Sequence, residues 1–204
     1  MCKSQRPLQE KIALMWHGHF ATSAEKVQDP QMNFELNQIF RTQGTGNFRE
    51  LVRAVGKSPA MLRYLDQQQS SDKKPNENWA RELMELFTLG IGNYTEQDIK
   101  EAARAFTGWT QRDGEFIFAR GRHDQGIKNI LGMRANFDGD QVVDLLTSRP
   151  ACAQFICTKL WKYFAYDDPE PYTSGWFAFR TVHNHTTIDN FRVYRLEKRG
   201  GEAE

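Results

Sequence analysis

Long apolar runs are missing from the sequence, and so is an excess of charge of either sign. No segment approaches the ~20 consecutive apolar residues that a membrane-spanning helix needs. The mean hydropathy of −0.69 likewise excludes a membrane-embedded chain. The 27 basic and 26 acidic residues leave a net charge of +1. The bulk charge therefore gives no attraction to nucleic acid or to an acidic membrane surface.

Cysteine is also scarce. Cys2, Cys152 and Cys157 are an odd number, contain no Cys-x-x-Cys pair and imply no disulfide framework. Cys152 and Cys157 are five apart on a predicted helix, where we interpret them as small apolar residues. Residues 1–7 contain no apolar signal-peptide segment. This predicts a cytoplasmic protein if Met1 is the true start, and an exported or periplasmic one if an N-terminal signal is missing.

Well-defined catalytic and cofactor motifs are absent as well. Ser23 lacks a Gly-x-Ser-x-Gly setting, no glycine loop of the Walker or Rossmann type is present, and no His-Glu-x-x-His occurs. Asp138 and Asp140 flank a glycine, but the spacing and the terminal glutamate of an EF-hand are missing. We expect one of these aspartates to cap a helix instead.

What the sequence does contain is helical periodicity. Hydrophobic residues make up 39% of the 204 residues and aromatic residues 12%, which is enough for a core. Apolar residues recur at helical spacing as far as Phe164, interrupted by a polar loop over residues 66–75. The pattern predicts helices over residues 8–21, 24–43, 48–56, 76–90, 96–107 and 150–164. It also predicts a helix that begins at residue 58 and another that contains residues 142–146.

Residues 76–90, NENWARELMELFTLG, are the most informative of these segments. Asn76 is a good N-cap, and Gly90 fits a left-handed C-terminal cap. Arg81 is placed to pair with Glu85 at i,i+4. The segment predicts a helix that packs at the centre of the fold and carries carboxylates beside its apolar stripe.

Near residue 115 the residue pattern changes from helical to strand-like. Residues 115–119 (EFIFA) are strand-like, Gly121 permits a turn, and Gly126 and residues 128–131 (KNIL) follow. A small β-hairpin is therefore predicted near residues 115–131. Together with the helices, it predicts a mainly α, multi-helix globular domain.

The helical pattern ends near residue 171, so the helical domain is predicted over residues 1–171. Residues 172–204 hold aromatic and basic residues, with His183 and His185, and show no cap or core stripe. This divergent tail is interpreted either as a binding arm or as non-native sequence from a frame change or truncation. We favour the second interpretation.

Several segments, in order along the chain, carry a family resemblance. They are residues 11–23 (KIALMWHGHFATS), 76–90, 94–98 (YTEQD), 103–109 (ARAFTGW), and 123–128 (HDQGIK) with the Leu-Gly that follows at 131–132. They resemble the bacterial family known as domain of unknown function 1800, over about residues 8–171. The resemblance implies a mainly helical protein that is longer at both ends, with an N-terminal part, including any export signal, missing here. It implies no reaction.

Polar and aromatic residues on these segments define a candidate site. Imidazole and carboxylate together suit zinc, manganese or iron, and a free carboxylate would serve as general base toward a metal-bound water. The candidates are His17, His19 and His123 as metal ligands, Glu82, Glu85 and Asp124 as catalytic carboxylates, and Arg81 and Trp109 as binding residues. His17 and His19 are two apart, so a regular helix directs them to different sides unless Gly18 distorts it.

Two functions follow from these residues. The favoured one is a structural or interaction protein of the cell envelope, with an envelope protein as partner and a buried His/Glu/Arg network that fixes helix packing. The alternative is a metal-dependent hydrolase with a divalent cation, which requires the histidines and carboxylates to converge in one pocket. A further interpretation, carbohydrate binding through Trp16, Trp79 and Trp109, competes with a core position for these rings.

Overall fold

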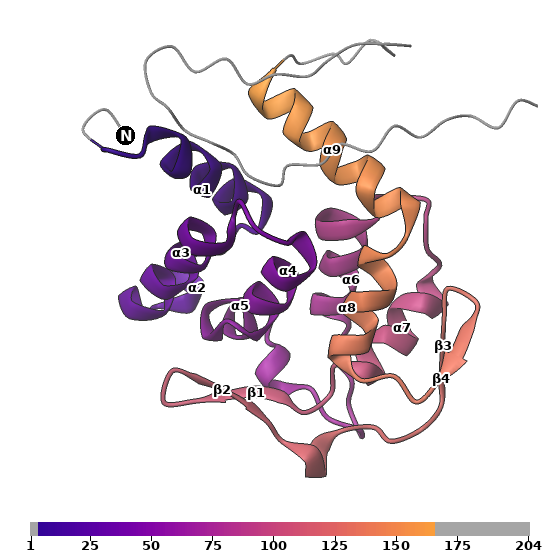
Figure 1. Ribbon diagram of the computed structural model, residues 1–204. Helices are drawn as coiled ribbons and strands as arrows, with labels where there is room; N and C mark the ends of the chain where they lie inside the picture. Colours follow the sequence, from indigo (N-terminus) through magenta and orange to yellow (C-terminus); the bar gives the residue numbers. More distant parts are fainter. Residues whose placement is uncertain (1–3, 166–204) are drawn as a thin grey trace, which may run out of the picture. The chain divides into compact units, whose positions relative to one another are not determined.

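The computed structural model describes residues 4–165, which form a mainly α-helical unit with two small β-hairpins (Figure 1). The predicted fold class is confirmed. None of the helices in this range is long and apolar enough to cross a membrane. The predicted tail, with His183 and His185, lies outside the described residues, as does Cys2. The helical elements are α1 (Pro7–His19), α2 (Ala24–Val27), α3 (Pro30–Gln43), α4 (Phe48–Lys57), α5 (Pro59–Tyr64), η1 (Gln67–Gln69), α6 (Glu77–Glu82), η2 (Leu83–Thr88), α7 (Glu96–Ala105), η3 (Arg120–Arg122), α8 (Gly139–Thr147) and α9 (Pro150–Phe164).

The single helix predicted over residues 24–43 is divided in the structure, and this part of the prediction is wrong. Gln28 takes a left-handed backbone, with a φ of 53°, and ends α2. Asp29 then caps α3 by accepting hydrogen bonds from two backbone N–H groups of its first turn, and Pro30 follows at the first helical position. Proline starts a helix there because its ring fixes φ and the N–H that it lacks has no helical partner.

The segment predicted as one helix over residues 76–90 changes type halfway. Its first part, α6, continues directly into η2, which is a π-helix. The backbone N–H of Leu89 donates to the carbonyl of Met84, five residues earlier, at 3.0 Å. Gly90 ends the element in the predicted left-handed conformation, with a φ of 78°. A Cβ on Gly90 would lie 2.9 Å from the ring of Phe155, so the glycine also lets α9 pack closely.

The β structure consists of two hairpins where one was expected. β1 (Trp109–Arg112) pairs antiparallel with β2 (Glu115–Phe118), and β3 (Lys128–Ile130) with β4 (Met133–Ala135). Their turns are Asp113-Gly114, with φ of 52° and 80°, and Leu131-Gly132, with φ of 51° and 78°. Two successive residues with positive φ suit a two-residue hairpin because the turn then matches the twist of the strands. Gly121, the predicted turn, lies in η3 between the hairpins.

Aromatic residues form the centre of the core. Trp79 meets Phe106 edge-on with ring centroids 5.9 Å apart, and Phe106 meets Trp109 in the same way at 5.0 Å. Two glycines let neighbouring helices approach these rings. A Cβ on Gly56 would lie 2.6 Å from the ring of Trp79, and one on Gly139 would lie 2.5 Å from that of Trp109. The helix of residues 76–90 thus packs at the centre of the core through Trp79.

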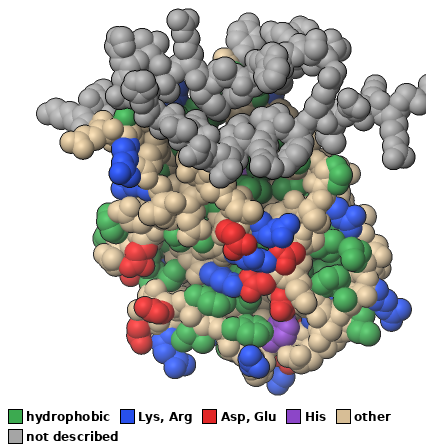
Figure 2. Space-filling view, in the orientation of Figure 1, with side chains coloured by type: hydrophobic (Ala, Val, Ile, Leu, Met, Phe, Trp, Pro, Cys, Tyr) green, Lys and Arg blue, Asp and Glu red, His purple; other side chains and the backbone are tan. Residues whose placement is uncertain are grey.

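Ion pairs join the outer faces of α4 and α8. Arg53 contacts the carboxylates of Asp140 and Asp144, and Lys57 Nζ lies 2.7 Å from Asp140. Figure 2 shows acidic and basic side chains beside one another on the face that presents these helices. Asp138 caps α8 in a capping box, which confirms the capping role expected for one of the two loop aspartates.

Candidate functional site

Three segments that are far apart in the sequence meet at His19. This residue ends α1, and its side chain is buried. Its Nε2 lies 3.1 Å from the carbonyl oxygen of Phe87 in η2, and its Nδ1 lies 3.2 Å from Nζ of Lys159 in α9. The same amino group donates to the carbonyl oxygen of Leu86 at 3.0 Å. We call His19, Lys159 and these two carbonyl groups the His19 junction.

The end of the π-helix supplies the acceptors of the His19 junction. The last carbonyl groups of a helix have no partner inside it and must be satisfied from outside. Leu86 and Phe87 lie in the final turn of η2, which ends at Thr88. Lys159 and His19 donate to their carbonyl oxygens. Through the hydrogen bond of His19 to Phe87, the segment KIALMWHGHF meets the segment NENWARELMELFTLG.

Burial fixes the protonation state of His19. Burial, followed by the nearby charge of Lys159, lowers the pKa of the imidazole to about 4, against the opposing effect of the hydrogen bond to Phe87. The ring is therefore neutral at pH 7. Because the Phe87 carbonyl only accepts, Nε2 carries the proton, and Nδ1 accepts from Lys159. Burial also lowers the pKa of Lys159.

A pocket of about 380 Å³ opens beside the His19 junction. It lies between the end of α1 and the second half of α9. Its lining residues are Met15, Gly18, His19, Lys159, Lys162 and Tyr163. Most of this lining is apolar, and its charged groups are two lysines.

A second polar cluster joins α7 to the second hairpin. Arg104 binds the carboxylate of Asp124 with two hydrogen bonds, Nε to Oδ2 at 2.7 Å and Nη2 to Oδ1 at 3.1 Å. Its Nη1 also donates to Glu101 at 2.9 Å. The Arg104 guanidinium is the main reason why the pKa of Asp124 lies below its usual range. The fully buried Lys128 donates to the backbone carbonyl of Asp124 at 2.6 Å and to Asn136 at 2.9 Å.

His123 is buried beside this cluster and contacts the end of α7. Its Nδ1 lies 2.9 Å from the carbonyl oxygen of Thr107, and its ring meets Phe118 edge-on with centroids 5.1 Å apart. The Thr107 hydroxyl accepts from the backbone N–H of Asp124 at 2.8 Å and donates to the carbonyl of Arg104 at 2.6 Å. His123 and Asp124 are therefore both held to the segment ARAFTGW.

The candidate residues of the central helix have other partners than those expected. Arg81 donates two hydrogen bonds of 2.7 Å to Glu96 of α7, and its predicted pairing with Glu85 does not form. Glu85 instead accepts from the hydroxyl of Tyr94 at 2.7 Å. Burial, followed by this bond, raises the pKa of Tyr94 to about 12. Burial and the neighbouring charge of Glu85 raise the pKa of Glu82.

His17 and Trp109 lie apart from these clusters. The side chain of His17 is exposed, and its ring lies edge-on to Phe40 with centroids 6.2 Å apart. The two-residue spacing on a regular helix thus separates His17 from the buried His19. Trp109 is buried against Phe106, and the two other tryptophans considered for carbohydrate binding are buried as well.

The histidines and carboxylates do not converge as the metal hypothesis requires. Within residues 4–165, no group of three His, Cys, Asp or Glu side chains is arranged so that it could hold a metal ion. His19 contacts η2 and α9, whereas His123 contacts Thr107. Glu85 has Tyr94 as its partner.

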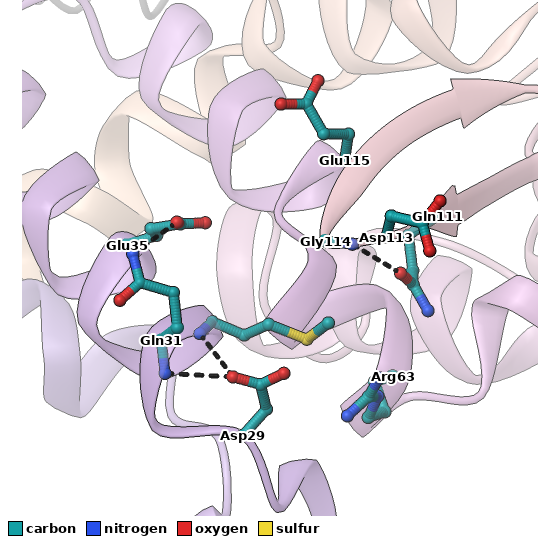
Figure 3. A pocket seen from close by; sticks show the side chains of 9 residues that line it. Asp29, Gln31, Glu35, Arg63, Gln111, Asp113, Gly114 and Glu115 are labelled. Carbon is teal, nitrogen blue, oxygen red and sulfur yellow. Dashed lines mark hydrogen bonds between the residues drawn. The ribbon is translucent and has the colours of Figure 1, made fainter.

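A larger cavity of about 520 Å³ lies between α3, α5 and the first hairpin. Figure 3 shows its charged side chains. Among them, the carboxylate of Asp29 accepts hydrogen bonds from two backbone N–H groups at the start of α3. Arg63 donates to the carbonyl of Val27 at 2.9 Å. None of the predicted site residues lines this cavity. Its charged lining residues are Asp29, Glu35, Arg63, Asp113 and Glu115.

Sequence reasoning missed Lys159 and Lys128. Lys159 is 140 residues from His19, and no local motif marks it. The available signal was its position four residues after Phe155, on the same side of a helix. Lys128 and the buried Ile130 are two residues apart along β3, so strand periodicity places both on one face. A lysine at such a position requires partners inside the protein.

Comparison with known proteins gives one match. A family model described as "Protein of unknown function (DUF1800)" matches residues 1–189. The match reaches beyond residue 171, where the resemblance was expected to end. No curated protein and no solved structure matches the chain.

Proposed function

Because the chain belongs to the DUF1800 family of proteins of unknown function, we propose a role from the contacts of its own residues. The protein is a non-catalytic structural or interaction protein of the cell envelope. Its buried and half-buried polar residues fix the packing of segments that are distant in the sequence. The His19 junction is the observation that carries this proposal.

The His19 junction uses its polar atoms on contacts between elements. Both ring nitrogens of His19 are engaged, one by η2 and the other by α9. Lys159 Nζ is held in addition by the Leu86 carbonyl and lies 4.4 Å from the centroid of the Phe155 ring. An imidazole with both nitrogens engaged in this way supports packing, because a buried polar group without a partner would destabilise the fold.

The second polar cluster, formed by Arg104 with Glu101 and Asp124, supports the same role. The carboxylate of Asp124 receives two hydrogen bonds from Arg104 and a third from the backbone N–H of Gly126 at 2.7 Å. A carboxylate held by three hydrogen bonds and ionised by a guanidinium is a weak general base, since its pKa is lowered. Its position instead links α7 to the loop before β3.

Metal dependence distinguishes this proposal from the metal-dependent hydrolase. The full-length chain is purified without chelator, its zinc, manganese and iron content is measured, and thermal unfolding is followed with and without EDTA. A structural role predicts the same Tm in both conditions and a lower Tm for His19→Gln in each. Stoichiometric metal that is lost in both His19→Gln and Glu82→Gln would overturn the proposal in favour of the hydrolase.

The location in the cell envelope is a separate part of the proposal and has a separate test. The chromosomal gene of the source bacterium is tagged at its 3′ end, and the cells are fractionated. Recovery of the tagged protein with the periplasm or the membranes supports the envelope location. Recovery with the cytoplasmic marker protein would refute this part and leave the structural role of His19 unaffected.

A further inference from the structure

The pocket beside the His19 junction is large enough for a small molecule and carries an uncompensated positive charge. Its volume of about 380 Å³ falls within the roughly 300–1,000 Å³ range of small-molecule sites. Lys159 and Lys162 are the charged residues of its lining. Within residues 4–165, neither lysine forms an ion pair with a carboxylate. The pocket is therefore electrostatically suited to an anion.

The surroundings of Lys159 sharpen this preference. Its amino group is held by the neutral imidazole of His19, by the carbonyl of Leu86 and by the face of the Phe155 ring. These partners orient the amine but provide no full negative charge. An ammonium group that is partly withdrawn from water is stabilised by a counter-ion, and burial indeed lowers the pKa of Lys159.

The other residues that line the pocket indicate what kind of group the anion should be attached to. Met15 supplies a flexible apolar side chain that adapts to irregular shapes. Tyr163, a residue that is 41% exposed, adds an aromatic ring, and Lys162 adds an alkyl stem. Gly18 leaves its part of the wall open, because a Cβ built there meets nothing within 4 Å. This lining favours an apolar chain over a polar or sugar-like body.

We propose that the pocket formed by α1 and α9 binds a small carboxylate with an apolar chain, such as a medium-chain fatty acid. The carboxylate is placed at Lys159, with Lys162 at the rim, and the chain lies against Met15 and Tyr163. This site goes beyond the proposed structural role of the His19 junction, because the junction holds the lysine whether or not the pocket is filled.

Octanoate is the probe, and isothermal titration calorimetry of the full-length chain is the measurement. Octanol has the same chain without the charge, octylammonium carries the opposite charge, and acetate has the charge without the chain. We expect octanoate to bind at least about tenfold more tightly than each of the three, because a charge-assisted hydrogen bond and the apolar chain must act together.

Two variants test the assignment of the residues. Lys159→Met should weaken octanoate binding at least about tenfold and remove its advantage over octanol. Gly18→Leu should abolish binding by placing a side chain in the pocket, and it should keep or raise the Tm because leucine favours a helix more than glycine does. Lys73→Met, which changes an exposed lysine in the loop before α6, is the control and should bind as the wild type does.

The outcomes are distinct. Octanoate that binds the wild type no more tightly than octanol would overturn the proposal, and so would the absence of any octanoate binding. Wild-type affinity in Gly18→Leu would place the ligand elsewhere and overturn it as well. If Lys159→Met fails to fold, the result for Gly18→Leu decides, because that variant removes no contact of the His19 junction.

Discussion

The protonation of His19 gives the sharpest prediction of how stability depends on pH. The pKa of the imidazole is about 4 in the folded protein, against 6.5 for an ordinary histidine. Between about pH 6.5 and about pH 4, the unfolded state therefore binds a proton that the folded state excludes. The contribution of His19 is fully present above about pH 6.5 and is lost as the pH falls toward 4.

The magnitude follows from the two pKa values. Linkage between protonation and folding gives a loss of about 2 kcal/mol in the free energy of unfolding between pH 7.5 and pH 5. The loss approaches about 3 kcal/mol when the pH lies below both values. Since the side chain of His19 is 8% exposed, solvent screening reduces these figures little.

The assay is urea unfolding at the two pH values for the wild type and for His19→Gln. Glutamine keeps an amide that can donate and accept at the His19 junction but does not titrate. The free energy lost by the wild type on acidification should exceed that lost by the variant by about 2 kcal/mol. His17→Gln is the matched control, because it removes an exposed histidine two residues away, and it should behave as the wild type does. Equal losses in the wild type and in His19→Gln would refute the reasoning.

Three further predictions concern glycines in different surroundings. Gly56→Ala should destabilise the fold by about 1–3 kcal/mol, because its Cβ would lie 2.6 Å from the ring of Trp79. Gly18→Ala should stabilise α1 by up to about 1 kcal/mol, because a Cβ there meets nothing within 4 Å and alanine favours a helix more than glycine does. Urea unfolding of the two variants checks the sign of each effect. Gly114→Ala should cost about 1–2 kcal/mol through backbone strain alone, because φ is 80° and a Cβ meets no atom within 4 Å. An unchanged chemical denaturation midpoint in Gly114→Ala would contradict the turn assignment.

The sequence carried enough local information to predict most helices and their caps. Asn76 caps α6 and Gly90 ends the following π-helix, because these residues act on the backbone within a few positions. The apolar spacing did not distinguish the π-helix from an α-helix, and the partners of its last carbonyls lie on α1 and α9, which are distant in the sequence. The hairpin turn at Asp113-Gly114 did have a signal, the Asp-Gly pair, which the choice of Gly121 overlooked.

The candidate site was less predictable because its partners are long-range. The separation of His17 from His19 follows from helical spacing, and the structure shows one exposed and the other buried. The pairing of His19 with Lys159 and that of Arg81 with Glu96 follow only from how the helices pack. Charge and spacing within one helix favoured Glu85 for Arg81, but its carboxylate partners are Glu77, four residues earlier on α6, and Glu96 on the neighbouring helix α7.

The central claim is that the polar residues singled out by the sequence hold elements of the fold together. A double-mutant cycle on Arg104 and Asp124 tests it most directly, using Arg104→Ala, Asp124→Ala and the double variant in urea unfolding at pH 7.5. The bidentate pair predicts a coupling energy of about 1.5–3 kcal/mol. The exposed pair Arg81 and Glu96 is the control and should give less than about 1 kcal/mol. A coupling near zero between Arg104 and Asp124 would contradict the account.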